Sequence, residues 1–147
     1  LFYVRPFLER MIKLARHQHP CPHISIFLHE AEDDLIVFAD ENLIAQVVTN
    51  LLKNAIQAIG NAADGRITLK AYCDEQESVH IEIANNGPVI DPEAAEQIFI
   101  PFFTTKEDGS GIGLSLSKQI MRLSGGTLTL LPYKEEGQAT TFALVFS

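Results

Sequence analysis

The sequence DENLIAQVVTNLLKNAIQAI, residues 40–59, decides how the rest of the chain is interpreted. Asp40 is a suitable N-cap, and Glu41 follows in the first turn, where a negative charge favours the helix dipole. The apolar side chains of this stretch recur at helical spacing and form one broad face: Ile44, Val47, Val48, Leu51, Leu52, Ala55, Ile56 and Ile59. The stretch therefore predicts a long helix with that face buried in the core.

A narrow polar stripe, Gln46, Asn50, Asn54 and Gln57, borders the apolar face. Asn is a poor helix former, so Asn50 and Asn54, one turn apart, need a reason. One interpretation is a solvated helix face. The other is a pair of side-chain carbonyl groups that bind one hard cation such as magnesium, which prefers oxygen ligands. The helix alone leaves both interpretations open.

Length and composition predict one globular domain, residues 1–147. Hydrophobic residues make up 46% and charged residues 20%, and the formal net charge of -8 argues against a nucleic-acid partner. Cys21 and Cys73 form no metal or redox motif, which predicts free thiols. The tract HQHPCPH, residues 17–23, matches no zinc-ligand spacing and is interpreted as a loop. No apolar run reaches the roughly 18 residues of a membrane helix, and no signal peptide is recognised at the N-terminus.

The hydrophobic pattern predicts alternating helices and strand pairs. Strands 23–30 and 35–40 are expected to form a hairpin, and Asp91 is expected to cap a short helix. The predicted helices are 6–16, 41–59, 92–98 and 114–123, and the remaining strands are 66–75, 78–86, 127–132 and 139–146. This order favours an α+β fold, a two-layer sandwich with one mixed sheet covered on one face by helices.

GSGIG, residues 109–113, comes directly before a predicted helix. Backbone N–H groups at a helix N-terminus bind phosphate oxygens. The motif follows no strand and is neither a dinucleotide-binding fingerprint nor a P-loop. By itself the motif is weak evidence, and a flexible hinge before a helix is the alternative interpretation.

Four motifs in order resemble the catalytic ATP-binding domain of sensor histidine kinases, in the GHKL superfamily that includes gyrase and heat-shock chaperone ATPases. They are NxxxNA at 50–55, NNGP at 85–88, FxPFFTTK at 99–106 and GSGIGLSL at 109–116. NAIQAI together with PFFTTK is most similar to the nitrogen-regulator type. The resemblance implies the Bergerat fold, a mostly antiparallel mixed sheet with about three helices on one face.

The resemblance also implies site residues. Asn54 would bind magnesium, with Asn50 in support, and Asn50 and Lys106 would be the catalytic positions. Residues 99–110 would form an ATP lid, and residues 1–17 a lead-in helix. The residues implied in binding Mg-ATP are Asn54, Asn85, Gly87, Ile90, Phe99, Phe102, Gly109, Gly111, Ile112, Gly113, Leu114 and Thr141.

The chain departs from the family pattern D-x-G-x-G, because Asn85 replaces the aspartate and Val89 the second glycine. A neutral amide makes a weaker hydrogen bond to adenine than a carboxylate does, so we expect weakened ATP binding and tighter binding by Asn85→Asp. Asn50 cannot act as a general base, because an amide has no useful proton affinity near neutral pH. Slow ATP hydrolysis follows.

The five histidines fall in predicted loops or strands, unlike the family's acceptor histidine on a long helix. The resemblance therefore implies that the γ-phosphoryl group passes to an upstream dimerisation and histidine-phosphoacceptor domain, and from there to a response regulator. The fragment is expected to be a monomeric cytoplasmic domain, and its parent a homodimer that an inner-membrane segment could anchor. Two alternatives remain open: a degenerate nucleotide-binding or interaction module without kinase activity, and a related serine kinase of an anti-sigma system.

Overall fold

The computed structural model describes residues 1–95, 97–101, 113–132 and 139–147. The predicted site residues Phe102, Lys106, Gly109, Gly111 and Ile112, and most of the predicted lid, lie outside these ranges. In chain order the described elements are β1 (Phe2–Tyr3), α1 (Val4–Gln18), β2 (Ile24–Ala31), β3 (Ile36–Val37), α2 (Glu41–Ile59), β4 (Gly65–Cys73), β5 (Val79–Asn85), α3 (Pro92–Ala95), α4 (Gly113–Leu123), β6 (Gly126–Leu130) and β7 (Thr140–Phe146).

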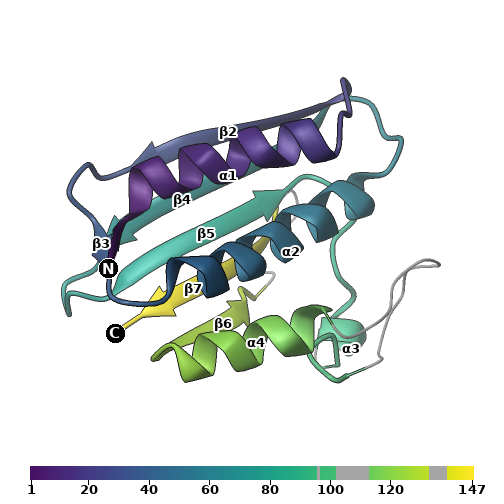
Figure 1. The fold of residues 1–147 in the computed structure, drawn as a ribbon. Helices are drawn as coiled ribbons and strands as arrows, with labels where there is room; N and C mark the ends of the chain where they lie inside the picture. Colours follow the sequence, from purple (N-terminus) through teal and green to yellow (C-terminus); the bar gives the residue numbers. More distant parts are fainter. Residues whose placement is uncertain (96, 102–112, 133–138) are drawn as a thin grey trace.

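The main sheet has five strands in the order β2-β4-β5-β7-β6. Strands β2 and β4 are parallel, and the other neighbouring pairs are antiparallel. Helices α1, α2 and α4 lie side by side over one face of this sheet (Figure 1). The predicted two-layer α+β sandwich with a mixed, mostly antiparallel sheet is confirmed.

The predicted hairpin of strands 23–30 and 35–40 is wrong. Strand β2 pairs in parallel with β4, and β3 pairs with β1, with Phe2 opposite Val37. The acidic turn after β2 suggested a local reversal, but parallel strands need a long crossover connection, which α2 supplies here. Hydrogen bonding from the Val4 N–H to the Leu35 carbonyl, at 3.0 Å, fixes the short β1–β3 pair at the start of α1.

Helix α2 is the central element of the helical layer. The Asp40 side chain accepts a hydrogen bond from the Asn42 N–H at 2.9 Å, so the predicted N-cap is confirmed. The predicted apolar face is buried except for Ile56, which is half-buried against the core. Burial of each large aliphatic side chain contributes about 1.5–3 kcal/mol to the stability of the folded chain. The apolar face therefore holds α2 against the sheet and fixes the position of the asparagines that α2 carries.

Two arginines of α1 donate hydrogen bonds to backbone carbonyl groups of the edge strand β2. The Arg5 guanidinium donates to the Ala31 carbonyl at 2.5 Å, and the Arg16 guanidinium donates to the Ile26 carbonyl. An edge strand with free backbone groups invites pairing with another chain. These two side chains reduce that exposure.

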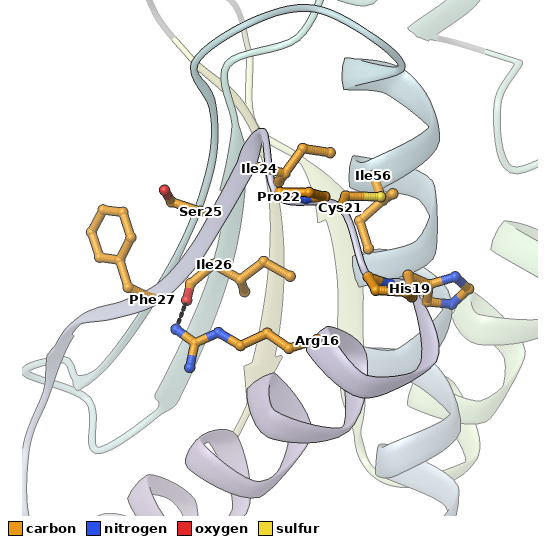
Figure 2. A pocket seen from close by; sticks show the side chains of 10 residues that line it. Arg16, His19, Cys21, Pro22, Ile24, Ser25, Ile26, Phe27 and Ile56 are labelled. Atoms are coloured by element: carbon orange, nitrogen blue, oxygen red, sulfur yellow. Dashed lines mark hydrogen bonds between the residues drawn. The ribbon is translucent and has the colours of Figure 1, made fainter.

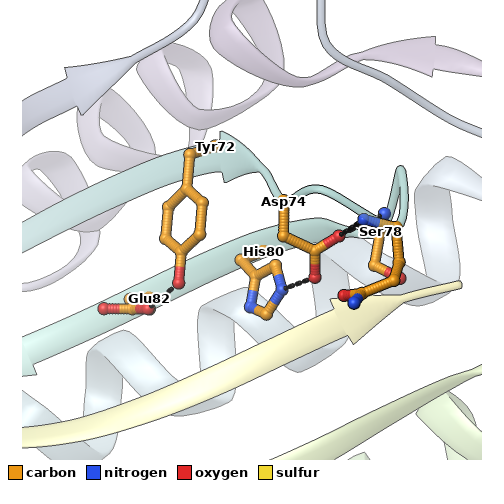
Figure 3. Close-up of polar contacts among 6 residues, drawn as sticks. Tyr72, Asp74, Ser78, His80 and Glu82 are labelled. Atoms are coloured by element: carbon orange, nitrogen blue, oxygen red, sulfur yellow. Dashed lines mark hydrogen bonds and ion pairs between the residues drawn. The ribbon is translucent and has the colours of Figure 1, made fainter.

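On the other face of the sheet, the described part of the chain places no helical layer (Figure 1). Tyr72 stacks on His80 with ring centroids 4.7 Å apart and donates a hydrogen bond to Glu82 at 2.8 Å. Asp74 accepts from His80 at 2.7 Å and from the Ser78 N–H (Figure 3).

Both cysteines are free, as predicted. Within the described residues, no helix is long and apolar enough to cross a bilayer.

Candidate functional site

The first part of the candidate site is the junction between α2 and the start of α4. The Asn50 Nδ2 atom donates to the Ser117 hydroxyl at 3.3 Å, and Ser117 is 3% exposed. A Cβ atom at Gly113 would lie 2.5 Å from Asn50 Oδ1, so only glycine fits without movement. The structure thus brings Asn50 and the last glycine of the GSGIG motif into direct contact.

A line of residues along α2 connects this junction to the end of β5. Asn50, Asn54 and Ala58 are spaced four residues apart, so they lie along one side of the helix. The line extends about 12 Å, at 1.5 Å of rise per residue. Asn54 is half-buried in the middle of it. Both asparagines therefore occupy the same side of α2, as predicted.

The second part of the site is the turn after β5. Asn85 is 5% exposed, and its Oδ1 atom accepts a hydrogen bond from the Gly87 N–H at 2.9 Å. A Cβ atom at Gly87 would lie 3.0 Å from Asn85 Oδ1 and 3.1 Å from the Ala58 carbonyl. The turn is therefore packed closely on the C-terminal part of α2.

Thr140 is a further candidate site residue, which the sequence reasoning did not name. It is the cross-strand partner of Asn85, and it is 7% exposed. Its Oγ1 atom has no hydrogen-bond partner among the described residues. The predicted Thr141 instead pairs with Ala84, on the alternate face of the sheet, and its hydroxyl donates to the Ala139 carbonyl at 3.2 Å. Side chains alternate between the two faces of a strand, so Thr140 faces the same side of β7 as the core residues Phe142 and Leu144. This alternation in the sequence could have identified Thr140.

Aromatic and apolar groups lie near both parts of the site. Phe99 contacts Phe142 edge to face, with ring centroids 6.3 Å apart, and Lys118 Nζ lies 4.5 Å from the Phe99 centroid. The predicted residues Ile90 and Leu114 are half-buried against the core. Lys118, which follows Ser117 on α4, was not predicted as a site residue. The structure places its cation beside the predicted residue Phe99.

The described part of the site contains neutral polar groups: amides, hydroxyls and backbone N–H groups. The described groups with shifted pKa values lie at the β4–β5 end of the sheet instead. Burial raises the pKa of Cys73, and the hydrogen bond from His80 lowers the pKa of Asp74. Burial, followed by the hydrogen bond to Glu82, raises the pKa of Tyr72 to about 12.

A cavity of about 510 Å³ lies elsewhere, at the end of α1. Figure 2 shows it beside β2, with Arg16 bonded to the Ile26 carbonyl and His19, Cys21 and Ile56 in its wall. It includes none of the predicted site residues. Among the described residues, no cluster of three or more His, Cys, Asp or Glu side chains could hold a metal ion. We therefore place the site at α2, α4, β5 and β7.

Residues 39–147 match the family described as histidine kinase-, DNA gyrase B-, and HSP90-like ATPase. The match covers well over half of the chain and includes α2, α4, β5 and β7. The chain belongs to this family.

Sensor kinases are among the similar proteins. The C4-dicarboxylate transport sensor protein DctB of Rhizobium meliloti (strain 1021) is 36% identical over 143 residues, which are 96% of this chain and 22% of DctB. The sensory histidine kinase/phosphatase NtrB of the same organism is 36% identical over 122 residues, 74% of this chain and 31% of NtrB. The chain thus spans about a fifth to a third of these relatives. Their names support the histidine kinase assignment and do not single out the nitrogen-regulator type.

Two solved structures share the fold. The nucleotide-free catalytic domain of histidine kinase ThkA has a TM-score of 0.82 and 29% identity, and the alignment covers 99% of this chain and 95% of that one. Full-length ShkA in complex with AMPPNP has a TM-score of 0.82 and 26% identity, over 99% of this chain and 30% of that one. The fold is therefore that of a histidine kinase catalytic domain.

Proposed function

We propose that the chain binds Mg-ATP and provides the catalytic half of a sensor histidine kinase, which transfers the γ-phosphoryl group to a histidine on a separate dimerisation domain of its parent. The observation that carries this proposal is the line Asn50–Asn54–Ala58, which joins the glycine start of α4 to the turn after β5. A nucleotide laid along this line would have its phosphates near α4 and its base near Asn85. The AMPPNP bound to the related ShkA supports the same ligand class.

The residues fit magnesium and a nucleotide. Asn50 donates to Ser117 through its Nδ2 atom and thereby fixes the start of α4. We assign Asn54 as the oxygen ligand of the metal and Asn50 as its support. The buried Thr140 hydroxyl, which has no partner in the part of the chain that the structure describes, is the kind of group that a bound ligand satisfies. Magnesium would supply neutralisation of phosphate charge. The chain itself would contribute alignment of the triphosphate.

No described side chain at the site is a suitable general base for water. Asn50 and Asn54 are amides, and the Ser117 hydroxyl already accepts a hydrogen bond. An imidazole acceptor is nucleophilic without such a base, so this arrangement suits transfer to histidine better than hydrolysis. We infer that a response regulator then receives the group, as the two-component partnership of the relatives suggests; ThkA has been solved with the response regulator TrrA.

Removal of the Asn54 amide tests magnesium-dependent binding. Asn54→Ala should weaken Mg-ATP binding about tenfold or more, the range typical of losing a group that supports a metal site. Gln57→Ala is the matched control, because Gln57 is an exposed amide on the same helix outside the line. Isothermal titration calorimetry with and without magnesium measures both. Equal affinities for the two variants would contradict the placement of the metal.

A second candidate function is a nucleotide-binding module without kinase activity. It is favoured by Asn85, which replaces a carboxylate by an amide already bonded to Gly87. The deciding experiment extends the chain by the parent's helical histidine segment and supplies γ-labelled ATP with magnesium. Acid-labile label on that segment supports the kinase. Bound ATP without label supports the module.

A further inference from the structure

Asn86, which directly follows β5, binds the start of β4 through its side chain. In the β4–β5 ladder Ile67 lies opposite Asn85, so Arg66 lies opposite Asn86. The Asn86 N–H donates to the Arg66 carbonyl at 3.2 Å. In a regular antiparallel pair the Arg66 N–H would donate to the Asn86 main-chain carbonyl in return. Here it donates to the side-chain oxygen Oδ1 at 2.7 Å, so the side chain takes the place of the main-chain carbonyl.

The other end of the same amide binds the turn between α2 and β4. The Asn86 Nδ2 atom donates to the Asp64 carbonyl at 2.9 Å. The Arg66 N–H can only donate and the Asp64 carbonyl can only accept, so these two partners fix which end of the amide is the oxygen. Asn86 therefore joins the chain that leaves β5 to the chain that enters β4.

The chain leaves the sheet at Asn86 and turns onto helix α2. Strand β5 ends at Asn85, and a Cβ atom at Gly87 would already lie 3.1 Å from the Ala58 carbonyl. The Gly87 N–H donates to Asn85 Oδ1 at 2.9 Å. Two successive asparagine side chains thus hold this turn, Asn85 through Gly87 and Asn86 through the backbone beside it. Ala58 is the end of the line of α2 residues that joins the two parts of the candidate site.

From this geometry, and resting on the nucleotide binding proposed above, we infer that Asn86 is a positioning residue of the nucleotide site. It fixes the point at which the chain leaves β5, and so it places Gly87 on Ala58. The bond to Arg66 is the principal contact, because it replaces a bond of the ladder, and the bond to Asp64 keeps the amide in the orientation that this contact requires. A turn that is ordered before binding spares the ligand the free-energy cost of ordering it.

Calorimetry with Mg-ATP tests the inference on Asn86→Ala, which removes both bonds. We expect the dissociation constant to rise about fivefold or more, because two neutral hydrogen bonds that order the turn are lost. Asp74→Ala is the matched control. Asp74 lies in the turn at the other end of the same two strands, and its carboxylate accepts from the Gln76 and Ser78 N–H groups, each at 2.9 Å. Its removal should leave the dissociation constant within about twofold, because that turn is remote from the site.

Urea denaturation of both variants separates positioning from stability. A purely structural role of Asn86 would lower the free energy of unfolding in both variants and leave the affinity of the folded chain for Mg-ATP unchanged in both. An Asn86→Ala dissociation constant within about twofold of the original, or an equal rise in Asp74→Ala, would overturn the inference and leave the proposed function standing. If the unmodified chain binds no Mg-ATP, the proposed function fails and the inference fails with it.

Asn86→Asp is the second variant, and it separates the two bonds of the amide. It keeps an oxygen acceptor for the Arg66 N–H and loses the donor to the Asp64 carbonyl. In moderate salt, which screens the added charge, its dissociation constant should rise less than that of Asn86→Ala. An equal or larger rise would overturn the assignment of the Arg66 bond as the principal contact.

Discussion

At the scale of single residues, the candidate site depends on the close packing of Gly113 against the Asn50 side chain, which leaves no space for a larger residue at position 113. Gly113 and Asn50 come from helices separated by more than fifty residues of sequence, yet an added methyl group at Gly113 would lie 2.5 Å from the Asn50 side-chain oxygen. The sequence marked both residues, since asparagine is unfavourable in mid-helix and GSGIG is a glycine-rich motif at a predicted helix start. Their contact could not be predicted, because it requires the packing of α4 on α2.

Gly113→Ala should lower the free energy of unfolding by about 1–3 kcal/mol, the usual cost of overpacking. The sign is informative, because alanine in place of glycine normally favours a helix. Urea denaturation measures the effect. In the Asn50→Ala background the clash is absent, so the same substitution should cost at least about 0.5 kcal/mol less. Identical costs in both backgrounds would show that Asn50 and Gly113 are not in contact.

At the scale of elements, the two faces of the sheet are used differently. The helix-covered face carries the core and the candidate site, and the open face carries cross-strand polar pairs between β4 and β5, with Tyr72 opposite His80 (Figure 3). Alternation in the sequence predicted these strands and their antiparallel pairing. Alternation alone does not say which parity faces the helices, and Thr141, which the family resemblance implied, lies on the parity opposite to the core residues Phe142 and Leu144.

The raised pKa of Tyr72 predicts a loss of stability at high pH. In the folded chain this pKa is about 12, against an ordinary value of 10.0, so the folded state holds the phenolic proton more tightly. The stabilisation is complete below pH 10 and disappears as the pH rises from 10 to 12. Unfolding free energies across this range should fall more for the unmodified chain than for Tyr72→Phe.

An ultraviolet difference titration between the same two proteins should place the Tyr72 midpoint near 12. Glu82→Gln removes the charge but not the burial, so it should shift the midpoint only part of the way towards 10. A midpoint near 10 in the unmodified chain would contradict the assigned environment of Tyr72.

At the scale of the whole molecule, the cavity and the candidate site lie in different parts of the fold. Helix α1 and edge strand β2 enclose the 510 Å³ cavity, and α2, α4, β5 and β7 hold the candidate site. Strand β4 lies between β2 and β5 in the sheet. This cavity is thus not the proposed nucleotide site.

Hydrogen exchange with excess Mg-ATP distinguishes these two regions. Bound ligand stabilises the folded chain by about 2.7 kcal/mol at one hundred times its dissociation constant. Beyond that general effect, the strongest added protection should appear in the first turns of α4 and in the turn after β5. Residues 16–27 around the cavity should show only the general effect. Preferential protection of residues 16–27 would place the nucleotide in the cavity instead.

The sequence by itself determined the three long helices, most of the strands, the free cysteines and the family motifs, because period, capping and glycine placement are local properties of a chain. The predicted helix 92–98 was too long, since α3 ends at Ala95 and residues 97–99 form a turn. Only the tertiary structure decided that β2 pairs with β4 across α2, that Thr140 and not Thr141 lies beside Asn85, and that Asn50 meets Gly113. These facts depend on which surfaces pack together. Packing joins residues far apart in the chain, and no local pattern records such contacts.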